Sequence, residues 1–286
     1  MLTRVLVTGA TGFIGSYVVP QLLERGLKVI ASSRNENKAE NYDWYSKVEY
    51  LECDYNNSNL DYYNYFWEPD IIIHLAWDGL PNYKDPFHVE RNLPANCLFL
   101  KNFIESGVKR MVVTGTCYEY GMQCGCLHES VPTQPVTYYG LAKDTLHKYL
   151  QYLVQDTQTS FNWVRLFYIY GKGQNPNSLL PQLEKAISEG KKEFNMSGGE
   201  QLRDYLPVED AARNICIIAL QNKITGTVNC CSGTPISIRR LVEERIAMLK
   251  SDIKLNLGYY PYSDYEPMAF WGDTSKLREI LWSDTR

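Results

Sequence analysis

The sequence contains no feature that would direct the chain into a membrane or onto a nucleic acid. No apolar run reaches the roughly 18 residues that a membrane-spanning helix requires, and the opening MLTRVLVTG lacks the long apolar segment of a signal peptide. The formal net charge is only -4, and acidic and basic residues are interspersed, so no basic patch is available for a phosphate backbone. We therefore expect a cytoplasmic protein without a membrane or nucleic-acid partner.

The sequence also lacks cysteines at metal-binding spacing. Its eight cysteines are scattered, and neither the Cys-x-Cys at 124–126 nor the Cys-Cys at 230–231 has a second pair at zinc-ligand spacing. A chain of 286 residues can bury a sizeable core without disulfides. A reducing compartment and no bound metal are the simplest expectations.

Short runs rich in Val and Ile alternate with helical patterns through the first two thirds of the chain. The contiguous apolar residues in DIIIHLA at 70–76 and RMVVTGT at 110–116 indicate strands that are buried on both faces, as in a parallel sheet covered by helices. Beyond these, loops rich in Gly, Asn and Pro separate shorter elements. The sequence predicts an α/β fold, with a Rossmann-type doubly wound parallel sheet in residues 1–168, a smaller α/β substrate lobe in residues 169–286, and a helix at 207–220 that packs back on the first domain.

Three glycines spaced three apart follow the first predicted strand, in VLVTGATGFIG at 5–15. Gly9 permits a tight turn out of the strand, Gly12 lets backbone N–H groups approach a pyrophosphate, and Gly15 lets the next helix pack closely against the strand. That helix directs its positive N-terminal end at the phosphates. The spacing alone is a weak signal, but with a strand before it and a helix after it, it predicts a dinucleotide-binding turn.

The end of the second predicted strand, VIASSR, indicates which dinucleotide binds. An acidic residue about 20 residues after the glycines would grip the 2′-hydroxyl of NAD, whereas this chain has Ser33 and Arg34. A hydroxyl and a cation suit a 2′-phosphate, so we expect NADP(H), with NAD(H) as the alternative. Asp54, at the end of the third strand, is a candidate acceptor for the adenine amino group.

Tyr139 and Lys143 lie four residues apart and share one face of the helix predicted for YYGLAKDTLHKYLQYL. A phenol with a pKa of about 10 is a poor proton shuttle at neutral pH, and an adjacent ammonium favours the phenolate. Lys143 can also hold a ribose hydroxyl. Thr116 follows a buried strand at the edge of the sheet where ligands bind, and it can hydrogen-bond the reacting oxygen. These three residues are candidate catalytic groups.

In this order and at these separations, the motifs resemble an extended short-chain dehydrogenase/reductase of the NAD-dependent epimerase/dehydratase family, over essentially the whole chain. The resemblance implies that Thr116, Tyr139 and Lys143 form a catalytic triad, with Asn92 positioning Lys143 through water. The matching blocks are TGATGFIG at 8–15, HLA at 74–76, TGTCYEYG at 114–121, YYGLAK at 138–143, RLFYIYGKGQ at 165–174 and RDYLPVEDAA at 203–212.

The family resemblance also implies two sets of ligand-binding residues. Arg203 would face the nucleotide diphosphate of a substrate, because its planar fork pairs with phosphate oxygens, and so would the loop around Leu180. The implied cofactor-binding residues are Gly9, Thr11, Gly12, Phe13, Ile14, Gly15, Ser33, Arg34, Asp54, Leu75, Ala76, Asn92 and Lys143. The implied substrate-binding residues are Thr116, Cys117, Tyr118, Tyr139, Tyr168, Leu180 and Arg203.

At several positions this sequence differs from particular subgroups of the family, and these differences reduce the number of reactions that we expect. Sugar-nucleotide 4,6-dehydratases place Asp-Glu directly after the catalytic Thr, where this chain has Cys117 and Tyr118, so dehydration is disfavoured. GDP-fucose synthases carry Ser-Ser-Cys there and a later histidine that has no counterpart in this sequence, so 3,5-epimerisation is not expected. UDP-galactose 4-epimerases often have Asn at the position of Tyr168 and hold NAD tightly, which fits poorly with Ser33 and Arg34.

The remaining expectation is a 4-ketoreductase. NADPH would reduce the C4 ketone of a nucleotide-linked 4-keto-6-deoxyhexose, dTDP-linked first and GDP- or CDP-linked next, to a 6-deoxyhexose for surface polysaccharides. The alternative is a nucleotide-sugar 4-epimerase with bound NAD; a non-enzymatic relative is disfavoured by the intact Tyr139 and Lys143. A homodimer is expected through outer apolar residues of two helices, namely Leu98, Leu146, Leu150 and Leu153.

Overall fold

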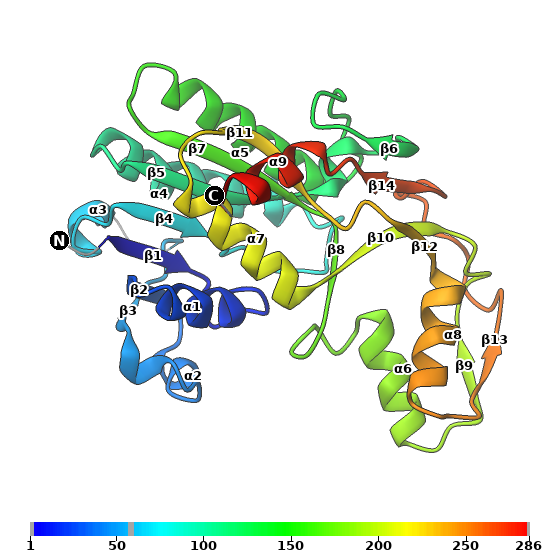
Figure 1. Ribbon diagram of the computed structural model, residues 1–286. Coiled ribbons are helices and arrows are strands. Elements are labelled where there is room, and N and C mark those ends of the chain that lie inside the picture. The colour runs from blue at the N-terminus through cyan, green and yellow to red at the C-terminus, as the bar shows by residue number, and fades with distance from the viewer. Residues whose placement is uncertain (1–2, 57–59, 285–286) are drawn as a thin grey trace.

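Figure 1 shows the computed structural model, which describes residues 3–56 and 60–284. Its centre is a seven-stranded sheet in the order β11-β7-β5-β4-β1-β2-β3, with every neighbouring pair parallel. The strand order reverses between β1 and β4, and such a reversal opens a crevice at the carboxyl ends of the strands. The strands are β1 (Arg4–Thr8), β2 (Lys28–Ser33), β3 (Glu49–Glu52), β4 (Ile71–His74), β5 (Arg110–Thr116), β7 (Ser160–Leu166) and β11 (Gly226–Cys230).

Helices cover both faces of this sheet because alternate strand residues point to opposite sides. Val5 and Val7 of β1 belong to the core beneath one helical layer, whereas Leu6 belongs to the core beneath the other. This confirms the predicted doubly wound α/β fold. The first layer contains α1 (Gly15–Glu24), α7 (Val208–Leu220) and α9 (Ser275–Asp284), and the second contains α3 (Tyr62–Tyr65), α4 (Leu93–Glu105) and α5 (Tyr138–Val154).

Two of the four leucines expected on an outer surface instead lie in the second core. Leu146 and Leu150 are fully buried between α5 and the sheet, because they lie four residues apart on the face of α5 that packs inward. Leu98 is the exposed member of the set, at 66%. The expected interface of α4 and α5 therefore cannot use Leu146 or Leu150.

The second lobe, at the lower right of Figure 1, packs α6 and α8 with short strands. Its own small core includes Leu183, Phe194, Val242 and Ile253. In the part of the chain that the structure describes, no helix is both long and apolar enough to cross a bilayer. The elements of this lobe are α6 (Leu179–Ser188), β9 (Glu193–Asn195), α8 (Ile238–Met248) and β13 (Lys254–Asn256), and β8 (Tyr168–Tyr170), β10 (Leu202–Pro207) and β12 (Pro235–Ser237) form a three-stranded sheet beside it.

The two lobes are not continuous in the chain. After β10 the chain returns to the large sheet as α7, which packs on α1, and as β11, which extends the sheet beside β7. The C-terminal α9 also packs on α7 and β11. The short elements at the sheet edges are α2 (Glu36–Ala39), η1 (Tyr45–Lys47), the π-helical turn η2 (His88–Asn92), η3 (Cys117–Tyr120), and the paired β6 (Gly125–Leu127) and β14 (Phe270–Gly272).

The turn between β1 and α1 has no room for side chains. Gly9 has a φ of +68°, and a Cβ there would lie 2.9 Å from the backbone nitrogen of Ala76 after β4. A Cβ on Gly15 would overlap the carbonyl oxygen of Gly9 and press on Ala10. The first glycine thus allows the turn and the third allows α1 to begin against it, as the sequence predicts.

We expect Gly15→Ala to lower the free energy of unfolding in urea by about 3 kcal/mol, because the added methyl group meets backbone that cannot move aside. Gly26→Ala is the matched control. Its Cβ would meet nothing within 4 Å, so only the left-handed backbone costs free energy, about 1 kcal/mol. Equal losses in the two variants would show that crowding at the turn is not the constraint.

Candidate active site

A cavity of about 280 Å³ opens at the carboxyl ends of β1, β2 and β4. Bare backbone at Gly9 and Gly12 forms one wall, and a hydroxyl and a guanidinium at the end of β2 form another. This combination fits a dinucleotide, whose pyrophosphate needs backbone N–H groups and whose ribose needs a polar partner after the second strand. Of the residues expected to bind the cofactor, Gly9, Thr11, Gly12, Ser33, Arg34, Leu75 and Ala76 line the cavity, and Phe13, Ile14 and Gly15 continue the turn into α1.

Arg34 is held at this cavity by a carboxylate that the sequence pattern did not indicate. Its guanidinium donates to both oxygens of Asp78, at 3.0 and 3.1 Å, and Arg91 donates to the same carboxylate at 2.5 Å. Burial opposes ionisation of Asp78, but the two guanidiniums lower its pKa. Lys38 also lines the cavity. The cavity rim therefore carries more positive than negative charge.

Three further residues assigned to the cofactor lie outside the walls of this cavity, namely Asp54, Asn92 and Lys143. Asp54 accepts from the backbone of Asn56 at 3.1 Å. The side-chain nitrogen of Asn92 donates to the carbonyl oxygen of Asp78 at 3.0 Å, and its buried Oδ1 has no hydrogen-bond partner among the described residues. Such an oxygen is available to a bridging water, as the expected link to Lys143 requires.

Thr116 and Tyr139 are brought together from β5 and α5. Thr116 ends β5 and caps η3, because its hydroxyl accepts from the backbone N–H of Tyr118 at 3.3 Å. Its own N–H donates to the carboxylate of Glu119 at 2.8 Å, which completes a capping box. Tyr139 lies in the first turn of α5, and the Thr116 side chain acts on its phenol, opposing the rise in the pKa of Tyr139 that burial causes. The two expected catalytic hydroxyls therefore meet.

The Lys143 ammonium is also buried at this point. It donates to the carbonyl oxygen of Thr114 at 2.8 Å and lies 4.0 Å from the centroid of the Trp77 ring. Burial lowers the pKa of Lys143 to about 7, and the negative charge of Glu119 opposes that shift. Burial likewise raises the pKa of the Tyr139 phenol, and the hydrogen bond with Thr116 opposes the rise. Burial, rather than an adjacent ammonium, dominates the ionisation of the phenol.

Aromatic rings enclose the Tyr139 phenol. The ring centroids of Trp77, Tyr83, His88 and Tyr118 lie between 5.3 and 6.1 Å from that of Tyr139. The expected substrate residue Cys117 is buried beside them, and burial raises the pKa of its thiol, so the thiol stays protonated. These rings and the low exposure of Tyr139 shield the phenol from water.

A second carboxylate, Glu266, gathers three of the expected substrate residues. It accepts from the hydroxyl groups of Tyr118 and Tyr168, the latter at 2.7 Å, and from the guanidinium of Arg203 at 3.2 Å. Arg203 is only 2% exposed and packs on the Phe270 ring, 4.8 Å from its centroid. Glu266 was not identified from the sequence, because it lies far along the chain in a loop without a motif.

The remaining expected substrate residue, Leu180, lines a different cavity. This space of about 640 Å³ is bounded by the loop after β8, by α6 and by α8. Gln174, Pro181 and the ion-paired Glu184 and Arg245, whose atoms approach to 2.6 Å, are among its walls. It is large enough to take part of a nucleotide-sized ligand.

The chain is similar to proteins of known activity. It is 32% identical to dTDP-6-deoxy-L-talose 4-dehydrogenase (NAD(+)) of Aggregatibacter actinomycetemcomitans, over 94% of this chain and 99% of that protein. It is 24% identical to dTDP-4-dehydro-6-deoxyglucose reductase of Escherichia coli, over 84% of this chain and 79% of the other. The fold matches UDP-glucuronic acid 4-epimerase from Bacillus cereus, solved with UDP-glucuronic acid and NAD, with a TM-score of 0.86, 22% identity, and coverage of 98% and 93%.

The family is shown by a match over most of the chain. The model of the NAD-dependent epimerase/dehydratase family matches residues 5–231, which include the glycine turn, Thr116, Tyr139, Lys143 and Arg203. This confirms the resemblance inferred from the motifs. The chain therefore belongs to the NAD-dependent epimerase/dehydratase family of enzymes.

Proposed function

We propose that this enzyme reduces the C4 ketone of a nucleotide-linked 4-keto-6-deoxyhexose, with dTDP as the first nucleotide to test, and that it uses NADP(H). The observation that carries the proposal is that the Thr116 side chain acts on the buried Tyr139 phenol, while the Lys143 ammonium, on the same helix as Tyr139, is bound to the carbonyl oxygen of Thr114 on the same strand as Thr116. Similarity over nearly the full chain to an enzyme named for a dTDP-6-deoxyhexose 4-dehydrogenation, the reverse type of reaction, supports the substrate class.

Tyr139 acts as the general acid in this proposal. A bound nicotinamide dinucleotide supplies the hydride that reduces the carbonyl carbon. Because burial raises its pKa, the Tyr139 phenol holds its proton at neutral pH and can give it to the carbonyl oxygen as that oxygen becomes an alkoxide. Thr116 donates a second hydrogen bond to the same oxygen. One carbonyl thus gains a hydride at carbon and a proton at oxygen, and the product is an alcohol.

Arg203, Tyr118 and Tyr168 hold the substrate in this proposal. For Arg203 to pair with the diphosphate, the Glu266 carboxylate must move aside, since it now pairs with that guanidinium. The hydroxyls of Tyr118 and Tyr168 would then be free to donate to the sugar. Leu180 and its cavity would contribute to nucleotide binding. A homodimer through α4 and α5 stays part of the proposal, with Leu98 as its exposed apolar residue.

Charge at the cavity rim supports NADP(H) over NAD(H). Arg34 and Lys38 line the cavity together with one carboxylate, that of Asp78, so a 2′-phosphate would meet net positive charge. Ser33 adds a hydroxyl, whose oxygen lies 2.8 Å from the Tyr50 hydroxyl. Two observations favour the alternative, a preference for NAD(H). Asp78 partly neutralises the charge of Arg34, and the relative that is 32% identical has NAD(+) in its name.

The second candidate function is 4-epimerisation of an intact nucleotide sugar with bound NAD. The fold likeness to a 4-epimerase solved with NAD favours it, since the same hydroxyls can remove and return a proton at O4. An epimerase consumes no cofactor overall, whereas a reductase consumes one dinucleotide for each sugar.

We expect the reduction of dTDP-4-keto-6-deoxyglucose to consume NADPH stoichiometrically and to give one 6-deoxyhexose product. Loss of the NADPH absorbance at about 340 nm measures cofactor consumption, and NMR identifies the sugar. GDP- and CDP-linked ketones, and NADH, are the comparison reactions. If none of them consumes cofactor, while an intact nucleotide sugar with a C4 hydroxyl is converted to its C4 epimer, the second candidate function replaces the first.

Tyr139→Phe should lower kcat by about 10²- to 10⁴-fold, because the general acid is lost, while the dinucleotide affinity stays within a few-fold. Steady-state kinetics and fluorescence titration with NADPH give the two quantities. Tyr138→Phe removes the neighbouring phenol, which is 45% exposed, and should leave both unchanged. Near-normal turnover by Tyr139→Phe would rule Tyr139 out as the acid.

Arg34→Ala should weaken NADPH binding by roughly tenfold or more, because a charge-assisted contact to the 2′-phosphate is lost, and should leave NADH binding nearly unchanged. Arg91→Ala is the control, since Arg91 contacts the same Asp78 but does not line the cavity. Equal weakening of NADPH and NADH in Arg34→Ala would contradict recognition of a 2′-phosphate at this position.

A further inference from the structure

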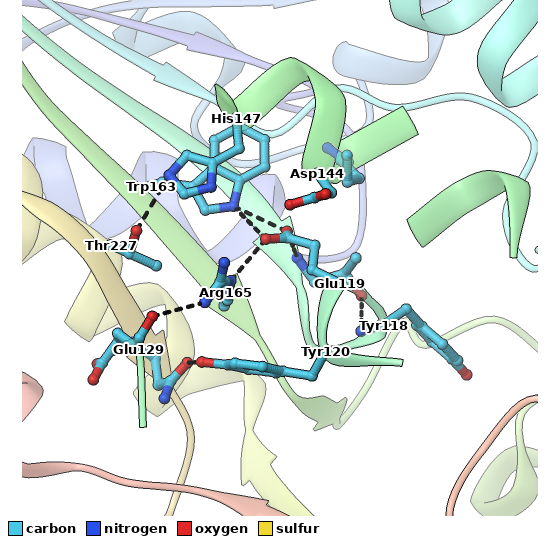
Figure 2. A network of polar contacts seen from close by, with 12 residues as sticks. Tyr118, Glu119, Tyr120, Glu129, Asp144, His147, Trp163, Arg165 and Thr227 are labelled. Atoms are coloured by element: carbon cyan, nitrogen blue, oxygen red, sulfur yellow. Dashed lines mark hydrogen bonds and ion pairs between the residues drawn. The ribbon is translucent and has the colours of Figure 1, made fainter. Parts of the chain in front are cut away.

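Three residues beyond Thr116 lies a buried carboxylate, that of Glu119, that no cofactor or substrate role uses. Glu119 is completely buried, and its two oxygens accept from three residues on two neighbouring strands, β5 and β7. These donors are the backbone N–H of Thr116 at 2.8 Å, the indole N–H of Trp163 at 2.9 and 3.1 Å, and the Arg165 guanidinium at 2.7 Å. Figure 2 shows Trp163 and Arg165 reaching Glu119 from the adjoining strand β7.

The end of β5 is shaped to admit this contact. Gly115 lies directly before Thr116, and a Cβ there would overlap both the indole nitrogen of Trp163 and the Glu119 carboxylate. Glu119 and Trp163 therefore meet across a position where only glycine fits. A buried charge destabilises the fold unless it is paired, and Arg165 provides that pairing for Glu119. The glycine at position 115 leaves the space in which the Glu119 carboxylate and the Trp163 indole meet.

The same carboxylate is coupled to Lys143. The Lys143 ammonium donates to Thr114, two residues before the N–H that Glu119 accepts, and it lies 5.9 Å from the centroid of the Trp163 ring that donates to Glu119. Other titratable groups that face Lys143 are His74 on β4 and His88 on η2. Burial lowers the pKa of both histidines, so both are neutral at neutral pH. Glu119 is thus the anion that acts on this ammonium among the described residues.

We propose that Glu119 is a positioning residue for the proposed reaction: its carboxylate fixes Thr116 at the end of β5 and keeps the Lys143 ammonium charged. Burial raises the pKa of the Glu119 carboxyl, and the ion pair with the Arg165 guanidinium at 2.7 Å opposes that rise. The inference rests on the proposed function for its kinetic consequence, but its electrostatic part concerns this chain alone and needs no substrate.

Glu119→Gln is the central test. Gln keeps the size of the side chain and an acceptor for the Thr116 N–H, but removes the negative charge. Because the variant leaves the buried Arg165 without a counter-charge, Glu119→Gln with Arg165→Met is made as well, which removes both charges and keeps the fold accessible. Asp144→Asn is the matched control, since Asp144 is a buried carboxylate within 4.8 Å of Glu119 that pairs with Lys148 instead.

The first readout is the titration of Lys143 without any ligand, by NMR of protein carrying ¹³C-labelled lysine, with the Lys143 signal assigned from Lys143→Arg. We expect a pKa of about 7 in the native protein, a value lower by about one pH unit in both Glu119 variants, and no change in Asp144→Asn. An unchanged Lys143 pKa in the folded Glu119 variants would overturn the inference.

The second readout is kinetic. We take the charged form of Lys143, beside the protonated Tyr139, to be the form that supports reduction in this proposal. The kcat then falls as pH rises through the Lys143 pKa, and in Glu119→Gln this fall should begin about one pH unit lower. In the low-pH range where kcat no longer changes with pH, we expect kcat of Glu119→Gln to be about 100-fold lower than that of the native enzyme, because Thr116 is displaced. The KM for the sugar nucleotide should be nearly unchanged. A rise in KM alone, with the native pH profile, would contradict the positioning role. If the native enzyme reduces no ketone but the Lys143 titration shifts as expected, the proposed function fails and the electrostatic coupling stands.

Discussion

Three positions at the carboxyl edge of the large sheet have no room for a side chain, and the rest of the site depends on them. Gly9 lets the turn after β1 approach the backbone at Ala76, and Gly15 lets α1 begin against that turn, which together shape the cofactor cavity. Gly115 lets Glu119 and Trp163 meet across the end of β5, which fixes Thr116. The dinucleotide-sized cavity and the proposed catalytic groups are thus positioned by close backbone packing at neighbouring strands of one sheet.

Burial then determines the chemistry of the groups held there. Burial raises the pKa of the Tyr139 phenol, so the phenol keeps its proton at neutral pH. Burial lowers the pKa of Lys143 to about 7. Each buried guanidinium nearby has a carboxylate of its own, Glu119 for Arg165 and Glu266 for Arg203. The first pair is part of the framework, whereas the second lies where the family resemblance implies a substrate diphosphate. A substrate anion could therefore exchange with Glu266 without leaving Arg203 unpaired.

Much of this arrangement could be predicted from the sequence, because local patterns encode it. Three local patterns predicted the fold and placed the candidate triad at one edge of the sheet: the glycine turn, the helical spacing of Tyr139 and Lys143, and the contiguous apolar residues of the strands. Partners from distant segments could not be predicted. Asp78 reaches Arg34, and Glu266 reaches Arg203, only through loops whose paths depend on tertiary packing. Leu146 and Leu150 were expected on the surface, because an apolar helix face does not reveal whether a sheet or a partner covers it.

The central claim is that the residues at this edge of the sheet direct the transfer of a hydride from the dinucleotide to a sugar ketone. The hydride stays in the product, and the oxidised dinucleotide is released. The most direct measurement uses NADPH with deuterium at both hydrogens of the nicotinamide C4 and locates the label in the sugar by NMR and mass spectrometry. The account predicts a single deuterium at C4 of a 6-deoxyhexose, with its hydroxyl proton taken from water through Tyr139. Recovery of the unlabelled ketone with the dinucleotide unconsumed, while a nucleotide sugar that carries a C4 hydroxyl is converted to its C4 epimer in a parallel reaction, would contradict it.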